Sequence, residues 1–280
     1  MTWSGDRLSE WSTANNDRPS DGASSGDHVC WVVTDPSVYV AQATTVLTDA
    51  HSAQHKPVVL GPRHSTELDQ LSAVAVAVDP YELRPTARLD PDVMFDVFRE
   101  QTASARAEGY QGVCVVADMD WLTPLNPTTA EIVAFELSLD RVILDLDMTV
   151  ICAYRQQSGN KDTVEAACCV HPTNVGNTAP PQFRLVAAPN NTWVLSGEID
   201  LAVASTFTTA LECVTASDGE CVIDVAELTF IDLASLHLIA NTAQTRNIQI
   251  RLINVAAPQR RLWDLTGLTG LAAGVELIAP

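Results

Sequence analysis

The chain has 280 residues, 46% of them apolar, which suffices for one large or two ordinary globular domains with buried cores. Its formal net charge is −19, from 35 acidic and 16 basic residues, and such a surface repels nucleic-acid phosphates and anionic lipids. No apolar run reaches the roughly 18 residues of a membrane-spanning helix. We therefore expect no direct nucleic-acid binding and no membrane association.

The first 27 residues are polar, rich in Ser, Asp and Gly, and lack the apolar core of a signal peptide. They have too little apolar surface to offset the entropy of ordering, so we predict a disordered leader and a cytoplasmic protein. Seven cysteines lie in or beside apolar segments without Cys-x-x-Cys spacing, which indicates buried apolar side chains rather than a metal site. The Cys168-Cys169 pair close to His171 leaves a metal or redox site open as an alternative.

From residue 28 onward, continuous Val/Cys/Ala/Ile runs alternate with amphipathic stretches, as in α/β proteins whose parallel sheet is covered on both faces. The predicted strands are 28–33, 57–61, 73–78, 112–117 and 148–154. The predicted helices are 37–53, 65–71, 91–108, 128–145 and 161–169. We predict a first domain over 28–172 and, because 173–182 is dense in Pro, Asn and Thr, a linker there.

Residues 183–280 are predicted to form a second, smaller α/β domain. Its predicted strands are 184–188, 192–196, 221–225, 248–254 and 275–278. A turn at Pro189-Asn190-Asn191 joins the first two strands, and the predicted helices are 201–214, 232–245 and 257–265.

Three segments of this second domain carry a resemblance to STAS domains, the module of bacterial anti-sigma factor antagonists. LSGEID at 195–200 matches the family pattern L-x-G-E-[LIV]-D. VIDVAELTFID at 222–232 matches V-[LIV]-D-L-x-x-[LV]-x-F-[IVM]-D, and LWDLTGL at 262–268 matches L-[FL]-x-[LI]-[ST]-G-L. The resemblance implies a module that binds a partner protein, here an anti-sigma factor or a related serine kinase.

The position of the family's phosphorylation switch differs in this chain. Asp232 follows a strand and precedes a helix, so it suits a helix N-cap, either as a purely structural cap or also as a recognition residue. The family has Ser or Thr next, and a partner kinase phosphorylates it, whereas this chain has Leu233. Ser235 is the remaining candidate phosphorylation site, although a local hydrogen bond explains it equally. The resemblance assigns partner binding to Glu198, Asp200, Asp232, Leu233 and Ser235.

Residues 27–172 resemble MEDS domains, predicted sensory modules with a degenerate RecA/KaiC-like core. The motifs are HVCWV at 28–32, GYQG at 109–112, ADMDW at 117–121, FE at 135–136, CAYR at 152–155 and the terminal HP at 171–172. A nucleotide-binding phosphate loop needs several glycines and a lysine, but the first strand runs into Thr34-Asp35-Pro36. We therefore expect no ATP hydrolysis, no cofactor and no catalytic residue.

The resemblance also suggests a small-molecule pocket, because ligands of open parallel sheets bind beyond the carboxyl ends of the strands. Its candidate residues are His28, Asp118, Trp121, Glu136, Tyr154 and His171. Each has a purely structural alternative: Trp121 as a core or interface aromatic, Asp118 and Glu136 as helix caps or partners of Arg141 or Arg155, and His171 as a helix terminator.

Three functions follow from these patterns. The first is a non-catalytic regulator that senses a small-molecule or stress signal in its first domain and binds an anti-sigma factor or kinase through its second. The second is an enzyme acting through the first domain, which no catalytic motif supports. The third is a constitutive scaffold or homo-oligomer of a signalling assembly, which Leu233 favours because a permanent binder needs no switch.

Overall fold

The computed structural model describes residues 27–62, 65–79, 89–146, 148–156, 160–176, 179–216, 219–268 and 273–280. The predicted leader, apart from its last residue, lies outside the described residues. The chain divides into two compact units: the first runs to residue 180 apart from 168–170, and the second comprises 168–170 and 181–280. We describe each unit by itself.

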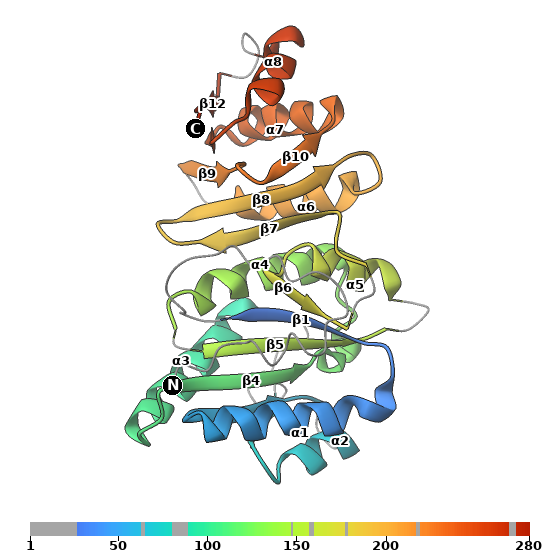
Figure 1. Cartoon of the computed structure of the whole chain (residues 1–280), viewed down its shortest axis with the longest axis vertical. Coiled ribbons are helices and arrows are strands. Elements are labelled where there is room, and N and C mark those ends of the chain that lie inside the picture. The colour runs from blue at the N-terminus through green and yellow to red at the C-terminus, as the bar shows by residue number, and fades with distance from the viewer. Residues whose placement is uncertain are drawn as a thin grey trace. The chain divides into compact units, whose positions relative to one another are not determined.

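The first unit is built on a parallel sheet of six strands in the order β3-β2-β4-β5-β1-β6. Figure 1 shows β4, β5, β1 and β6 of this sheet side by side. The strands are β1 (His28–Val33), β2 (His55–Leu60), β3 (Val76–Val78), β4 (Gly112–Asp118), β5 (Met148–Arg155) and β6 (Thr173–Val175). Strands β1, β4 and β5 are buried along almost their whole length, which explains their unbroken apolar sequences.

Helices connect these strands and cover both faces of the sheet. They are α1 (Pro36–Ser52), α2 (Thr66–Leu71), α3 (Pro91–Ala107), the 3-10 helix η2 (Met119–Leu125), α4 (Thr129–Ile143) and α5 (Lys161–Cys168). One core packs α1 and α2 against the side chains of Trp31, Val116 and Ile151. Because strand side chains alternate, Cys152 and Tyr154 face the opposite side, where α4 lies.

The second unit has a mixed sheet in the order β10-β8-β9-β11-β12, with β7 paired antiparallel to β8. Its strands are β7 (Phe183–Ala188), β8 (Thr192–Ile199), β9 (Glu220–Asp224), β10 (Leu228–Ile231), β11 (Gln249–Ile253) and β12 (Val275–Leu277). Its helices are α6 (Ala204–Val214), α7 (Leu233–Arg246) and α8 (Ala257–Leu265). The turn between β7 and β8 places Asn190 and Asn191 at φ of 59° and 57°, a conformation that Asn tolerates well.

The predicted architecture, a mostly parallel RecA/KaiC-like α/β sheet followed by a smaller STAS-type α/β unit, is confirmed. Three elements are additional to the predicted ones. They are η2, the short strand β6 and strand β10. Strand β6 forms from the first three residues of the expected linker and pairs with β1, since Val29 aligns with Thr173 and Trp31 with Val175.

Candidate functional site

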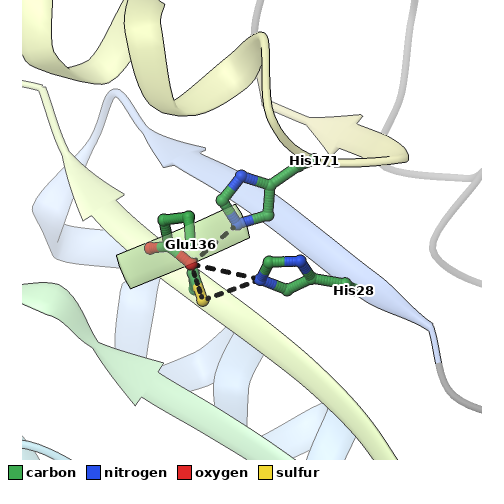
Figure 2. Close-up of side chains that lie close together, drawn as sticks. His28, Glu136 and His171 are labelled. Carbon is green, nitrogen blue, oxygen red and sulfur yellow. Dashed lines mark hydrogen bonds and ion pairs between the residues drawn. The ribbon is translucent and has the colours of Figure 1, made fainter. Parts of the chain in front are cut away.

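A buried cluster of polar side chains lies between the sheet of the first unit and α4. Figure 2 shows the rings of His28 and His171 and the carboxylate of Glu136 pointing toward one another. The exposed fractions of these three residues are 1%, 0% and 0%. Glu136 Oε2 lies 3.2 Å from His28 Nε2 and 3.5 Å from His171 Nε2. The sulfur of Cys152 completes the group, 3.5 Å from Glu136 Oε2 and 3.6 Å from His28 Nε2.

These residues meet because distant parts of the chain converge on one face of the sheet. His28 opens β1, Cys152 lies on β5, Glu136 projects from α4, and His171 follows α5 at the end of the domain. Helix α4 begins with a capping box in which Thr128 and Glu131 bond each other's backbone N–H groups. A helix fixed in this way presents Glu136 and Asp140, four residues apart, on the same side.

A second layer of hydrogen bonds fixes the orientation of each member. His28 Nδ1 lies 3.2 Å from Asp140 Oδ1, and the Tyr154 hydroxyl donates to Glu136 Oε1. His171 Nδ1 lies 2.7 Å from the carbonyl oxygen of Ala167, and a carbonyl can only accept. His171 therefore carries its proton on Nδ1, and the lone pair of its Nε2 faces the cluster.

Two opposing influences set the pKa values in the cluster. Burial disfavours the charged form of each group, and hydrogen bonds and neighbouring charges can favour it. Burial alone would lower the pKa of His28, but hydrogen bonds to Asp140 and Glu136 outweigh it and raise this pKa to about 9. The pKa of His171 falls to about 4, because its ring is buried and faces the positive charge of His28. Burial also opposes ionisation of Glu136, yet the His28 cation and the Tyr154 hydroxyl hold its pKa below the ordinary value. At neutral pH the cluster holds a histidine cation, a neutral histidine and a carboxylate.

Asp118 belongs to a separate group on the other face of the sheet. Its Oδ2 accepts from Arg155 Nη2 at 2.6 Å, and its Oδ1 caps η2 by accepting from the N–H of Asp120. Arg155 also lies 3.3 Å from Glu67, and its guanidinium stands 5.0 Å from the centre of the Tyr39 ring on α1. Asp118 therefore has the structural role of a helix cap and a partner of Arg155.

Asp118 gives the stability of the first unit a defined pH dependence. Burial raises its pKa from 3.8 to about 6, against the opposing effect of Arg155. Between these values the folded state binds the proton more tightly than the unfolded state, so stability falls as pH rises through this window, by up to about 3 kcal/mol. We expect Asp118→Asn to remove that slope in urea unfolding curves at pH 4 to 6. Asp96→Asn, at an exposed residue, should keep it, and an unchanged slope in Asp118→Asn would contradict the prediction.

Trp121 also lies apart from the buried cluster. It sits in η2, is 2% exposed, and packs edge-on against Phe135 with ring centroids 6.2 Å apart. This contact corresponds to the core-aromatic alternative. Of the six candidate ligand residues, the structure thus brings together His28, Glu136, Tyr154 and His171, and it separates Asp118 and Trp121 from them.

Two members of the cluster are absent from the sequence-based candidates. Cys152 stands in the CAYR motif, two positions before Tyr154, so strand alternation places both side chains on one face. Asp140 stands one helical turn after Glu136. The spacings were visible in the sequence, but nothing in the sequence indicated which face of the strand would meet which helix.

In the second unit, the candidate residues surround the junction of β8, β10 and α7. Asp232 is the N-cap of α7 and accepts from the N–H of Ser235 at 2.8 Å. Leu233, the first residue of α7, is 43% exposed, whereas Ser235 is 3% exposed. Asp200 accepts from the N–H of Ala202 at 2.8 Å, and Glu198 is exposed on β8. Phosphorylation of Ser235 would therefore require the first turn of α7 to open.

Comparison with known families agrees with the two-unit organisation. A family model described as MEDS, the methanogen/methylotroph DcmR sensory domain, matches residues 27–172, which is more than half of the chain. A model described as the Mlab STAS domain matches residues 188–277. No curated protein matches the chain. None of the helices in the described part of the chain has the length and apolar character that a membrane span requires. The chain thus belongs to the MEDS sensory-domain family and carries a STAS domain after its MEDS domain.

Proposed function

We propose that this protein is a non-catalytic, cytoplasmic signalling regulator. Its MEDS domain senses a small-molecule or stress signal, and its STAS domain binds an anti-sigma factor or a related serine kinase. The pairing of a sensory family with a partner-binding family supports a regulatory role. All seven cysteines are free thiols, in keeping with a reducing compartment. The observation that best supports a protein partner is the exposed apolar surface beside Asp232.

That surface joins the ends of two paired strands to the start of α7. Phe230 on β10 is 49% exposed, Leu233 is 43% exposed, and Leu201, just after β8, is 82% exposed. Strand β10 runs parallel to β8 with Phe230 aligned to Glu198, which places the apolar Phe230 beside an acidic residue. Apolar anchors with a polar surround are the usual composition of a protein interface.

The local structure favours control by the first domain rather than by phosphorylation. Leu233 has no hydroxyl, and the Ser235 side chain is buried within α7. In addition, Asp35 occupies the N-terminus of α1 and accepts from the N–H and hydroxyl of Ser37. A carboxylate at this position disfavours the phosphate groups that a nucleotide would place there. These contacts support a regulator without a phosphoswitch and without ATP chemistry.

The test is direct binding of the full chain to anti-sigma factor kinases of the same organism, measured by calorimetry. We expect Leu233→Glu to weaken binding at least tenfold, which is about 1.4 kcal/mol, because it places a charge in an apolar contact. Leu265→Glu, at an exposed leucine on α8, is the matched control and should bind as the wild type does. Absence of binding to every kinase, or equal weakening by both variants, would refute the proposed interface.

A constitutive scaffold or homo-oligomer is the second candidate function, favoured by the leucine at the switch position. It predicts a concentration-independent oligomer in light scattering that persists when kinases are added. A monomer that forms a complex with a kinase favours the regulator. Mass-spectrometric mapping of phosphorylation after incubation with cellular kinases distinguishes control by phosphorylation from control by the first domain. Phosphate on Ser235 would show that the STAS domain still has a phosphorylation switch.

A further inference from the structure

The buried cluster in the MEDS domain has the composition of a transition-metal site. His28, Glu136, Cys152 and His171 each offer one ligand atom, and these four atoms lie within 4.8 Å of one another. Two imidazole nitrogens, a thiolate and a carboxylate oxygen are the donor types that Zn²⁺ prefers. We propose that this cluster binds one zinc-type divalent metal ion through His28 Nε2, His171 Nε2, Glu136 Oε2 and Cys152 Sγ. Binding releases two protons, one from the His28 cation and one from the Cys152 thiol, because only an unprotonated imidazole nitrogen and a thiolate coordinate a metal.

The separations between the donor atoms support tetrahedral coordination. Zinc bonds of 2.0 to 2.3 Å place the ligand atoms of a regular tetrahedron about 3.3–3.7 Å apart. Of the six separations among Glu136 Oε2, Cys152 Sγ and the two Nε2 atoms, four are 3.2, 3.5, 3.5 and 3.6 Å, and all six lie within 4.8 Å. The two remaining separations join His171 Nε2 to His28 Nε2 and to Cys152 Sγ and are at most 4.8 Å, so the side chains need to move by no more than about 1 Å to receive the ion.

The outer hydrogen bonds match those that orient metal ligands. Metal-binding histidines usually donate their other N–H group to a carboxylate or a backbone carbonyl. His28 Nδ1 lies beside Asp140, and His171 Nδ1 donates to Ala167. Tyr154 holds Glu136 Oε1, which leaves Oε2 for the ion. Each of these three ligands therefore has a fixed orientation toward the centre.

An unsatisfied nitrogen at the centre is the independent observation that points to a ligand. Nε2 of His171 is fully buried and has no hydrogen-bond partner among the described residues. A buried polar atom without a partner destabilises a protein by about 1–3 kcal/mol, so such atoms are uncommon unless something else binds them. A metal ion between this nitrogen and Glu136 Oε2 would satisfy it.

This inference goes beyond the proposed function and does not depend on the partner of the STAS domain. It concerns four residues that are far apart in sequence, from the first strand of the MEDS domain to its final His-Pro motif. A bound ion would join β1, α4, β5 and the segment after α5 at a single point. The four protein ligands would leave no open coordination position, which is typical of structural rather than catalytic zinc.

The test uses the full chain, stripped of metal with a chelator and titrated with Co²⁺ as a spectroscopic probe. Tetrahedral Co²⁺ gives intense visible bands, and a thiolate ligand adds a charge-transfer band in the near ultraviolet. We expect one Co²⁺ per chain, with both features, and displacement by Zn²⁺. No saturable Co²⁺ spectrum would show that the cluster is a hydrogen-bonded ionic network only.

Two variants locate the ion. Cys152→Ser should abolish the charge-transfer band and weaken Co²⁺ binding at least tenfold, because the thiolate is the softest ligand of the set. Cys114→Ser is the matched control, since Cys114 is fully buried on β4 and contributes to the core on the other face. Retention of the band in Cys152→Ser would overturn the assignment.

X-ray absorption of the zinc-loaded wild-type protein provides a measurement that is independent of how well the variants fold. The expected first shell has one sulfur at about 2.3 Å and three nitrogen or oxygen atoms at about 2.0–2.1 Å. A shell without sulfur, or with more than one sulfur, would place the ion elsewhere and refute this site.

Discussion

Replacing Glu136 with alanine is expected to lower the free energy of unfolding of the first unit by about 3–5 kcal/mol. The carboxylate is 0% exposed and lies at the centre of the cluster, in contact with His28, His171 and the Tyr154 hydroxyl. Without it, the His28 cation loses one of its two carboxylates, and the Tyr154 hydroxyl loses its acceptor. Urea unfolding in the presence of a chelator measures the change in the metal-free protein.

Glu131→Ala is the matched control for this prediction. Glu131 lies on the same helix, at its exposed first turn, where it completes the capping box with Thr128. Losing that cap is expected to cost about 1 kcal/mol. Glu136→Gln distinguishes loss of the negative charge beside His28 from loss of the hydrogen-bond acceptor of Tyr154. Its amide oxygen still accepts from the Tyr154 hydroxyl, whereas the charge is removed. Equal destabilisation by the two alanine variants would mean that the buried cluster contributes nothing beyond helix formation.

Replacing Gly197 with alanine is expected to destabilise the second unit by about 3–5 kcal/mol. Gly197 adopts a φ of +86°, which an L-residue with a side chain rarely adopts. An added Cβ would lie 2.4 Å from the carbonyl oxygen of Gln182 and 3.0 Å from Phe183 Cα, and both are backbone atoms that cannot turn away. Thermal unfolding of the full chain, followed by calorimetry, measures the loss.

Gly219→Ala isolates the contribution of the close approach. Gly219 also has a positive φ, +111°, but no atom lies within 4 Å of its added Cβ. Its variant is expected to lose about 1–2 kcal/mol from backbone strain alone. The excess in Gly197→Ala then measures the clash with the neighbouring strand. If both variants lose the same free energy of unfolding, the backbone of β7 can move away from the added Cβ, and the close approach to β8 contributes nothing to the loss.

Gly197 shows what the sequence reveals about this domain and what requires the three-dimensional structure. The motif LSGEID at 195–200 is one of the three segments that carry the resemblance to STAS domains. The reason for its glycine is tertiary, because β8 pairs with β7 and β10 at this residue, aligned with Phe183 and Leu228. A linear pattern shows which residue is required, and the neighbouring strands show why.

Most elements of the fold could be predicted because they depend on local patterns. The buried strands β1, β4 and β5 have continuous apolar sequences, and the cap Asp232 marks the start of α7. Strands β6 and β10 were not predicted, since they are only three and four residues long and depend on pairing with β1 and β8. Pairing with a distant strand leaves little trace in a short sequence.

The candidate site shows the same division. Local patterns were enough to predict the two families, the α/β class, and the presence of His28, Glu136, Tyr154 and His171 in the MEDS motifs. It is the packing of the sheet against its helices that brings these residues together, adds Cys152 and Asp140 to them, and pairs Asp118 with Arg155 on the opposite face. The physical reason is that the face of a strand and the helix covering it are set by how the whole sheet packs, and this choice is not encoded at any single position.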